Sequence, residues 1–259
     1  MKCKDHVKCR CCGSDKLEPY LDLGMMPLAN NLELTKEDAI NAQRFPLKVM
    51  ICQDCSLSQL SVVIDPELLF SNYFYRSSMS QGYKDHCKQM AIDLQNKYGF
   101  NSDSFIIDIA GNDGALLHEF DKVIKPWKSL NVDPAKNLVK ANEALGVRQY
   151  CTFWGMEAAK QLVAMGWTKA DLITATNVFA HVDDVKGFLE AAKFALKPEG
   201  VIVIEFPYIR DFIEKGEFDT VYFEHLSYFS ITPLELLAFD CDAYCKHNKA
   251  EYTRRFCSR

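Results

Sequence analysis

The chain has 259 residues, of which 48% are hydrophobic and 25% are charged, values typical of a globular protein with a normal core. Its net charge of −5 at pH 7 argues against a binder of duplex nucleic acid, because such proteins present a basic face. The polar N-terminus lacks the apolar core of a signal peptide, and no apolar run reaches the roughly 18 residues of a membrane span. The sequence therefore predicts a cytoplasmic protein that binds neither nucleic acid nor membrane.

The cysteines are concentrated near the N-terminus, where six of the eleven precede residue 56. In a reducing compartment, clustered cysteines are more often metal ligands than disulfide partners. Two Cys-x2-Cys pairs, Cys9 with Cys12 and Cys52 with Cys55, supply the four thiolates that tetrahedral Zn²⁺ requires. Cys11 lies inside the first pair and can take the place of Cys9 or Cys12, and the alternative to a metal site is a small core of reduced cysteines. The pairs predict a closed, structural zinc site.

The first hundred residues divide into two parts. Residues 1–62 are expected to form the zinc-binding domain, because so short a segment buries little apolar surface and gains folding energy from a metal. Residues 63–100 are expected to be a helical connector that contributes to the active site, with a long amphipathic helix over 81–98. Two isolated cysteines, Cys87 and Cys151, are expected to pack as small hydrophobic side chains.

Residues 101–235 alternate between apolar strand patterns and amphipathic helix patterns. Strands are predicted at residues 105–109, 130–133, 147–151, 171–175 and 200–205, with a helix between each consecutive pair. This alternation predicts an α/β fold, a Rossmann-like doubly wound parallel sheet, preceded by the small zinc-binding module. A helix is expected to begin near residue 232, and residues 236–259 show no periodicity and are expected to be a truncated or aberrant stub.

A glycine-containing turn, residues 108–114, follows the first strand of this domain and predicts a nucleotide site. It lacks the third glycine of a dinucleotide motif, and no basic residue follows to meet a phosphate. S-adenosylmethionine (SAM) has no phosphate, and its cationic methionyl end suits a loop that carries Asp108 and Asp113. Asp133, at the end of the second strand, is placed to bind the ribose hydroxyls. The backbone of Gly111, Asn112 and Gly114 completes the expected cofactor site.

The order of these motifs resembles the sugar C-methyltransferases, which act on nucleotide-linked deoxy-ketosugars. The resemblance runs to about residue 237 and is most specific in the string Glu-His-Leu-Ser-Tyr-Phe-Ser at residues 224–230. The matching stretches are residues 9–13, 23–31, 51–60, 73–80, 108–114, 177–182 and 218–230.

The resemblance implies a SAM-dependent methyltransferase with a zinc module, a central SAM domain of the class I methyltransferase fold, a third C-terminal domain and a nucleotide-diphospho-sugar substrate. It implies that His225 removes the proton next to the ketone, a task for which an imidazole titrating near neutral pH is suited. The other residues implied at the reacting centre are Tyr75, His181, Tyr222 and Glu224. Ser78, Ser80 and Asn177, in the matching motifs, are expected to join the cofactor site, and the protein is expected to be a monomer.

Three features depart from the family pattern. Ala110 and Phe223 stand where Gly and His are usual, and the chain ends roughly where the third domain should begin. We therefore expect a truncated chain with an incomplete sugar site, and an inactive family member is one alternative reading. Two others are an NAD-dependent oxidoreductase, which the missing third glycine disfavours, and a non-catalytic zinc ribbon that docks a partner.

Overall fold

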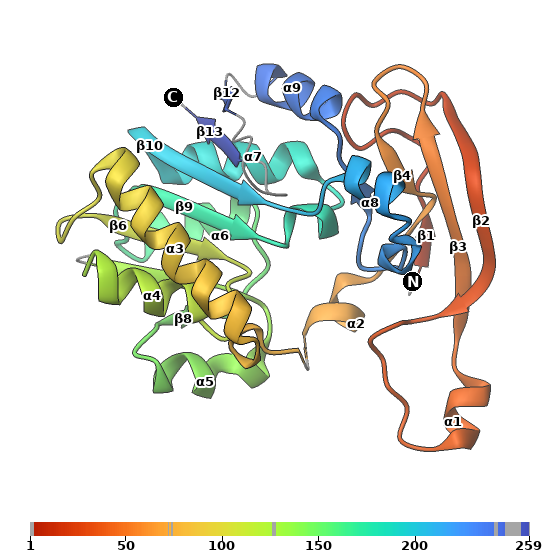
Figure 1. Ribbon diagram of the computed structural model, residues 1–259, viewed down its shortest axis with the longest axis horizontal. Coiled ribbons are helices and arrows are strands. Elements are labelled where there is room, and N and C mark those ends of the chain that lie inside the picture. The colour runs from red at the N-terminus through yellow and green to blue at the C-terminus, as the bar shows by residue number, and fades with distance from the viewer. Residues whose placement is uncertain are drawn as a thin grey trace.

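The computed structural model describes residues 3–71, 73, 75–125, 128–240, 243–246 and 255–258. A parallel five-stranded sheet forms the larger part of the molecule, and a Cys-rich antiparallel module packs at the end where the parallel strands terminate (Figure 1). The parallel strands are β6 (Phe105–Ile109), β7 (Lys128–Val132), β8 (Gln149–Tyr150), β9 (Ala170–Thr176) and β10 (Leu196–Glu205). They lie in the order β10-β9-β6-β7-β8, which confirms the predicted class I methyltransferase fold.

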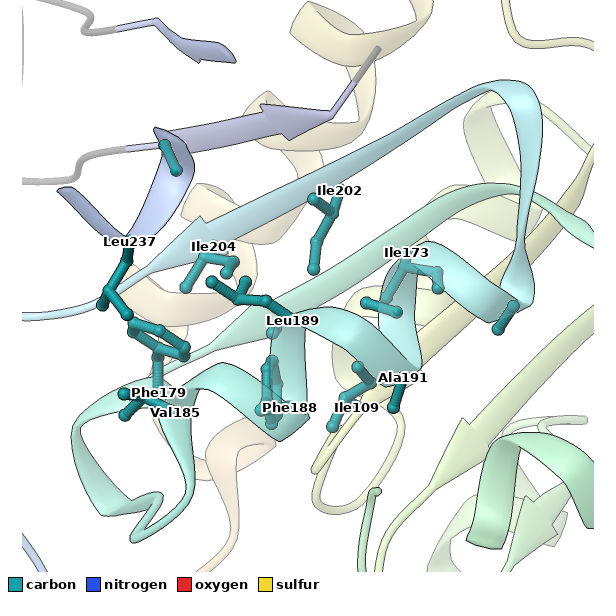
Figure 2. Packing of buried hydrophobic residues seen from close by; sticks show 14 of the residues in the cluster. Ile109, Ile173, Phe179, Val185, Phe188, Leu189, Ala191, Ile202, Ile204 and Leu237 are labelled. Atoms are coloured by element: carbon teal, nitrogen blue, oxygen red, sulfur yellow. The ribbon is translucent and has the colours of Figure 1, made fainter. Parts of the chain in front are cut away.

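Strand order reverses between β6 and β9, and ligands of such sheets bind at the carboxyl ends of strands beside this switch point. Alternate side chains of the strands enter two hydrophobic clusters, one on each face. Figure 2 shows the cluster in which Ile173 and Ile202 meet Phe188 and Leu189 of α7. The helices of the two faces are α3 (Gln81–Tyr98) with α4 (Ala115–Val123), and α6 (Met156–Ala164) with α7 (Val185–Ala195). The short α5 (Val139–Ala144) precedes β8.

The N-terminal module is built on two small sheets. In the first, β1 (Cys3–Asp5) pairs with β5 (Val62–Ile64). In the second, the order is β11-β4-β3-β2, formed by β2 (Leu17–Pro27), β3 (Arg44–Cys52), β4 (Ser58–Leu60) and β11 (Ser227–Tyr228). The strand β11 comes from beyond the parallel sheet, so the N-terminal module includes residues far outside 1–62. The helices α1 (Lys36–Asn41) and α2 (Pro66–Phe70) follow β2 and β5, and the Asp65 side chain caps α2.

The C-terminal part is more regular than the sequence pattern suggests. The helix α9 (Ile231–Asp240) begins near the expected position and is followed by β12 (Ala243–Lys246) and β13 (Arg255–Ser258), which pair antiparallel. Strands of this length are too short to show a recognisable alternation. Residues 241–242, 247–254 and 259 of the expected stub lie outside the described residues. An additional helix, α8 (Ile209–Lys215), links β10 to the turn that carries the proposed base.

Two further expectations can be compared with the structure. Cys87 is buried on α3 as expected, but the same expectation was wrong for Cys151, which is exposed because β8 ends at Tyr150 and leaves it in a loop. Within the described ranges, no helix combines the length and apolarity needed to cross a membrane.

Candidate active site and zinc centre

The four cysteines of the two Cys-x2-Cys pairs converge on one point. Their sulfur atoms all lie within 4.8 Å of one another, with Cys9 Sγ 3.4 Å from Cys55 Sγ and Cys12 Sγ 3.6 Å from Cys52 Sγ. Tetrahedral Zn²⁺ with Zn–S bonds of about 2.3 Å separates its sulfurs by about 3.8 Å, so the four thiolates fit this ion. Cys11 is not among the four residues whose sulfurs cluster, and its thiol donates to the carbonyl oxygen of Pro233 at 3.2 Å.

A cavity of about 930 Å³ lies at the carboxyl ends of the parallel strands, where the switch point predicts a ligand. The glycine turn after β6, Asp133 after β7 and Asn177 after β9 all line it. The N-terminal module contributes Asn30, and the segment before α3 contributes tyrosines. The predicted residues that line the cavity are Gly111, Asn112, Asp133, Asn177, Tyr75, His181, Tyr222 and His225.

Three residues of the glycine turn have backbone angles in the left-handed region, where φ is positive. Ala110 has φ +54°, Asn112 has φ +53° and Gly114 has φ +82°. A left-handed conformation costs alanine on the order of 1 kcal/mol relative to glycine. Ala110 stands where Gly is usual in the family, and the structure shows that this position has a positive φ. At Gly111 the constraint is space, because a Cβ atom would lie 2.4 Å from Asp108 Oδ2 and 2.8 Å from Asn131 Oδ1.

We expect Gly111→Ala to lower the affinity for SAM at least tenfold and to destabilise the fold by about 1–3 kcal/mol, the usual cost of overpacking. The two neighbouring side chains are fully buried and have no free space to move into. Gly155→Ala is the matched control, because Gly155 lines the same cavity and nothing lies within 4 Å of its added Cβ. Calorimetric titration and urea unfolding measure the two effects, and equal behaviour of both variants would contradict the close-approach argument.

Asp133 is fixed on the turn after β7. One carboxylate oxygen accepts from the backbone N–H of Asn112 at 2.9 Å and the other accepts from that of Ala135 at 2.8 Å. Burial raises the pKa of this carboxyl group, and the two backbone donors oppose that effect. Each oxygen keeps a lone pair, so the group is oriented to accept the two hydroxyls of a ribose.

We expect Asp133→Ala to weaken binding of both SAM and its demethylated product by about 1–3 kcal/mol, roughly 5- to 150-fold, through lost charge-assisted hydrogen bonds. Calorimetry with both ligands is the measurement. Equal affinities for the wild-type chain and the variant would show that the ribose lies elsewhere.

Five predicted cofactor residues support the cavity wall without lining it. Asp113 accepts from the Ser78 hydroxyl at 2.6 Å, and Ser80 Oγ accepts from the Tyr83 N–H at the start of α3. Asp108 is fully buried; its Oδ1 accepts from Thr174 Oγ1 at 2.7 Å, and burial raises its pKa to about 7. The five residues are Asp108, Asp113, Gly114, Ser78 and Ser80, and their direct contact with SAM stays a prediction.

Sequence reasoning missed the apolar wall of the cavity. Phe153 and Trp154 line it opposite the turn after β7, which contributes Pro134 and Ala135. The Trp154 indole N–H donates to the carbonyl oxygen of Phe188 at 3.2 Å, which fixes the ring. The sequence feature that could have indicated this wall is a pair of aromatic residues shortly after a strand of the parallel sheet.

His225 is held in a defined tautomer by its neighbours. Its Nδ1 lies 2.8 Å from the carbonyl oxygen of Thr220, which can only accept, so Nδ1 carries the proton. Nε2 is therefore an acceptor, and the Tyr222 hydroxyl donates to it at 2.8 Å. Burial lowers the pKa of the His225 imidazole, so the neutral form prevails at neutral pH.

His181 packs beside this pair. Its ring stacks on His225 with centroids 5.1 Å apart and on Phe70 at 5.6 Å. Burial, with a smaller contribution from His225, lowers the pKa of His181 to about 3. Tyr75 also borders the cavity but is exposed.

Glu224 lies in the turn that carries Tyr222 and His225. Residues 222–225 form this turn, which the His225 N–H closes by donating to the Tyr222 carbonyl. Glu224 is buried, does not line the cavity, and accepts from Asn30 Nδ2 at 2.9 Å. Its place at the reacting centre stays a prediction. Phe223 packs edge-on against Phe45 in the core of the N-terminal module, where an apolar side chain fits.

Comparison with known proteins agrees with this architecture. A family model described as "Putative zinc binding domain" matches residues 9–70, and one described as "Methyltransferase domain" matches residues 107–202. The C-methyltransferase NovU of Streptomyces niveus is 30% identical over 227 residues, which cover 88% of this chain and 53% of that protein. The chain thus spans about half the length of this relative.

Solved methyltransferases share the fold. An O-methyltransferase family protein from Burkholderia thailandensis superposes with a TM-score of 0.53 at 15% identity, covering 68% of this chain and 57% of that one. A S-adenosylmethionine-dependent methyltransferase from Clostridium acetobutylicum gives a TM-score of 0.50 at 13% identity, covering 68% and 90%. The matches are consistent with the sugar C-methyltransferase family that the motifs resemble. The chain therefore has the class I SAM-methyltransferase fold, with a methyltransferase domain preceded by an N-terminal zinc-binding domain.

Proposed function

We propose that this protein transfers a methyl group from SAM to the carbon next to the ketone of a nucleotide-linked deoxy-ketosugar. The observation that carries the proposal is the tautomer of His225, whose Nε2 is an acceptor at the cavity that the SAM loop lines. C-methylation needs such a base, because a carbon atom becomes nucleophilic only after a proton next to a carbonyl group is removed.

The residues of the cavity fit SAM. The glycine turn approaches closely, Asp133 offers oriented carboxylate oxygens, and Phe153 with Trp154 offers an apolar surface for a purine. When bound, SAM supplies an electrophilic methyl group. No step of proton transfer depends on it, and the protein's own side chains carry that part of the reaction.

The proton transfer follows from the geometry. A ketosugar that displaces the Tyr222 hydroxyl from Nε2 presents its acidic C–H to this nitrogen, which takes the proton and becomes an imidazolium stabilised by the Thr220 carbonyl. The electron pair moves to the ketone oxygen as an enolate. The freed Tyr222 hydroxyl or the neutral His181 can donate a hydrogen bond to that oxygen.

The charge of the cavity suits the sugar ring rather than its anionic leaving group. Among the described residues that line the cavity, none is Lys or Arg, whereas five are acidic: Glu67, Asp133, Asp183, Asp184 and Glu190. The ring with its ketone is uncharged, so the proposal places the ring inside the cavity and the diphosphate beyond it.

The test has two arms. Calorimetry should detect SAM and its demethylated product but not NAD, and NAD binding alone would favour an oxidoreductase. In D₂O, with the demethylated product bound, a nucleoside-diphosphate deoxy-ketosugar should exchange the proton next to its ketone, a reaction followed by NMR. Binding of SAM without any exchange over the uncatalysed rate would contradict the assigned substrate.

A further inference from the structure

Arg10 joins the zinc-binding knuckle to the reacting centre. It stands between the metal ligands Cys9 and Cys12, and its side chain is fully buried. Its Nε donates to Asp183 Oδ1 at 3.1 Å, and its Nη1 donates to the carbonyl oxygens of Leu60 at 3.0 Å and Leu226 at 3.2 Å. One guanidinium therefore bonds three separate segments of the chain.

Two of these segments carry the histidines of the cavity. Leu226 directly follows His225, and Asp183 comes two residues after His181, whose ring stacks on His225. The geometry points to Arg10 as a positioning residue that sets the two histidine-bearing segments relative to each other, using the zinc knuckle as its base. The catalytic part of this inference rests on the proposed function, and its structural part does not.

The planar fork of arginine explains why this residue type is needed. Its five donors have fixed directions and can meet a carboxylate and two carbonyls at once, whereas a lysine ammonium acts as a flexible point charge. The backbone that carries this side chain is also held in place. The Arg10 N–H donates to Gln59 Oε1 at 2.9 Å, and Gln59 Nε2 donates to the Lys8 carbonyl.

Asp183 is held from the same module by two other groups. Lys4 Nζ lies 2.8 Å from Oδ2, and His6 Nδ1 lies 3.2 Å from Oδ1. Loss of Arg10 would thus leave Asp183 with two partners, while the Leu226 carbonyl would keep one, the backbone N–H of Leu60 at 3.0 Å. The turn that carries His225 should be the more sensitive of the two segments.

The experiment compares Arg10→Met with Lys4→Met in the full chain. Both variants remove one cation from Asp183. They differ because the Lys4 side chain is 59% exposed and its ammonium bonds Asp183, whereas Arg10 also bonds the Leu226 carbonyl. In Arg10→Met we expect the ring signals of His225 and His181 to shift in ¹H–¹⁵N NMR spectra, while zinc stays at one per chain and SAM affinity changes less than twofold. Lys4→Met should leave those signals in place.

Exchange of the sugar proton adds the catalytic readout. The maximal exchange rate should fall at least tenfold in Arg10→Met with little change in the half-saturating sugar concentration, and Arg10→Lys should restore only part of it. A role confined to stabilising the knuckle would instead lower the zinc content. If the wild-type chain exchanges no proton, the proposed function fails while the NMR comparison still tests Arg10.

Two outcomes would overturn the inference. One is a set of unchanged histidine signals in zinc-loaded Arg10→Met, and the other is an equal shift in Lys4→Met. If Arg10→Met does not fold, Asp183→Ala replaces it, because it removes the acceptor of the bond from Arg10 Nε and leaves the cysteines of the knuckle unchanged. In this Asp183 variant the His181 ring signal should shift, and an unchanged His181 signal would contradict the inference that Arg10 positions this segment.

Discussion

His225→Asn should reduce exchange of the sugar proton by roughly 10²- to 10⁴-fold, the contribution of a positioned general base, with SAM affinity unchanged within about twofold. The asparagine amide retains a donor near the Thr220 carbonyl but offers no basic nitrogen where Nε2 stands. NMR-detected exchange and calorimetry measure the two quantities. His118→Asn is the control, because His118 lies on α4 and does not line the cavity.

The pH dependence of the same reaction provides a second signature of His225. Burial lowers its imidazole pKa, so the catalytically competent neutral form persists below the ordinary value of about 6.5. The rate should therefore be level through neutral pH and decline on the acid side only below about 6.5. A decline centred above pH 7 would remove His225 as the base. Exchange that survives in His225→Asn would also remove it and would favour Tyr222 or His181.

Cys52→Ser should abolish stoichiometric zinc binding and unfold the N-terminal module. Structural zinc sites contribute about 10–16 kcal/mol of apparent binding free energy to small domains, so losing one of four thiolates is among the most damaging changes available. Elemental analysis should give about one zinc per wild-type chain and little for the variant. Thermal unfolding of Cys52→Ser should lack a transition that the wild-type chain shows, or should show it at a lower temperature.

Two cysteine variants serve as controls for this prediction. Cys11→Ser should retain zinc, because Cys11 bonds Pro233 and lies outside the cluster, and a serine hydroxyl can make the same bond. Cys87→Ser should also retain zinc and cost only about 1–3 kcal/mol for burying a hydroxyl. Zinc-free wild-type protein prepared without chelators, or zinc loss in Cys11→Ser, would contradict the assigned ligands.

The sequence predicted those elements whose patterns are long and local. The helix over Gln81–Tyr98 matches its predicted bounds because Ser80 caps one end and Gly99, in the left-handed region, ends the other. Four of the five parallel strands were predictable because each contains a run of buried residues followed by a turn. The fifth, β8, is only the half-buried pair Gln149–Tyr150, shorter than the predicted range of residues 147–151. The zinc ligands were found because tetrahedral coordination imposes their spacing on the sequence.

Features that depend on distant contacts were not predictable in this way. The strand β11 has two residues, too few to show alternation, and exists because β4 offers it an open edge. Phe153 and Trp154 belong to the cavity only because the sheet order brings β8 beside β7. The choice among Cys9, Cys11 and Cys12 needed the position of Pro233, which the chain reaches more than two hundred residues later.

The pairing of β11 with β4 also orders events during synthesis. The edge of β4 must remain unpaired until residue 228 has left the ribosome, an interval of roughly 8–34 seconds at about 5–20 residues per second. An open strand edge is a template for wrong partners, so the nascent N-terminal module is exposed to mispairing throughout that time. The same delay means that His225 meets the rest of its site only after the whole parallel sheet has been made. The cavity is therefore completed late in synthesis, and nascent chains stalled before residue 228 would carry the zinc ligands but no complete cavity.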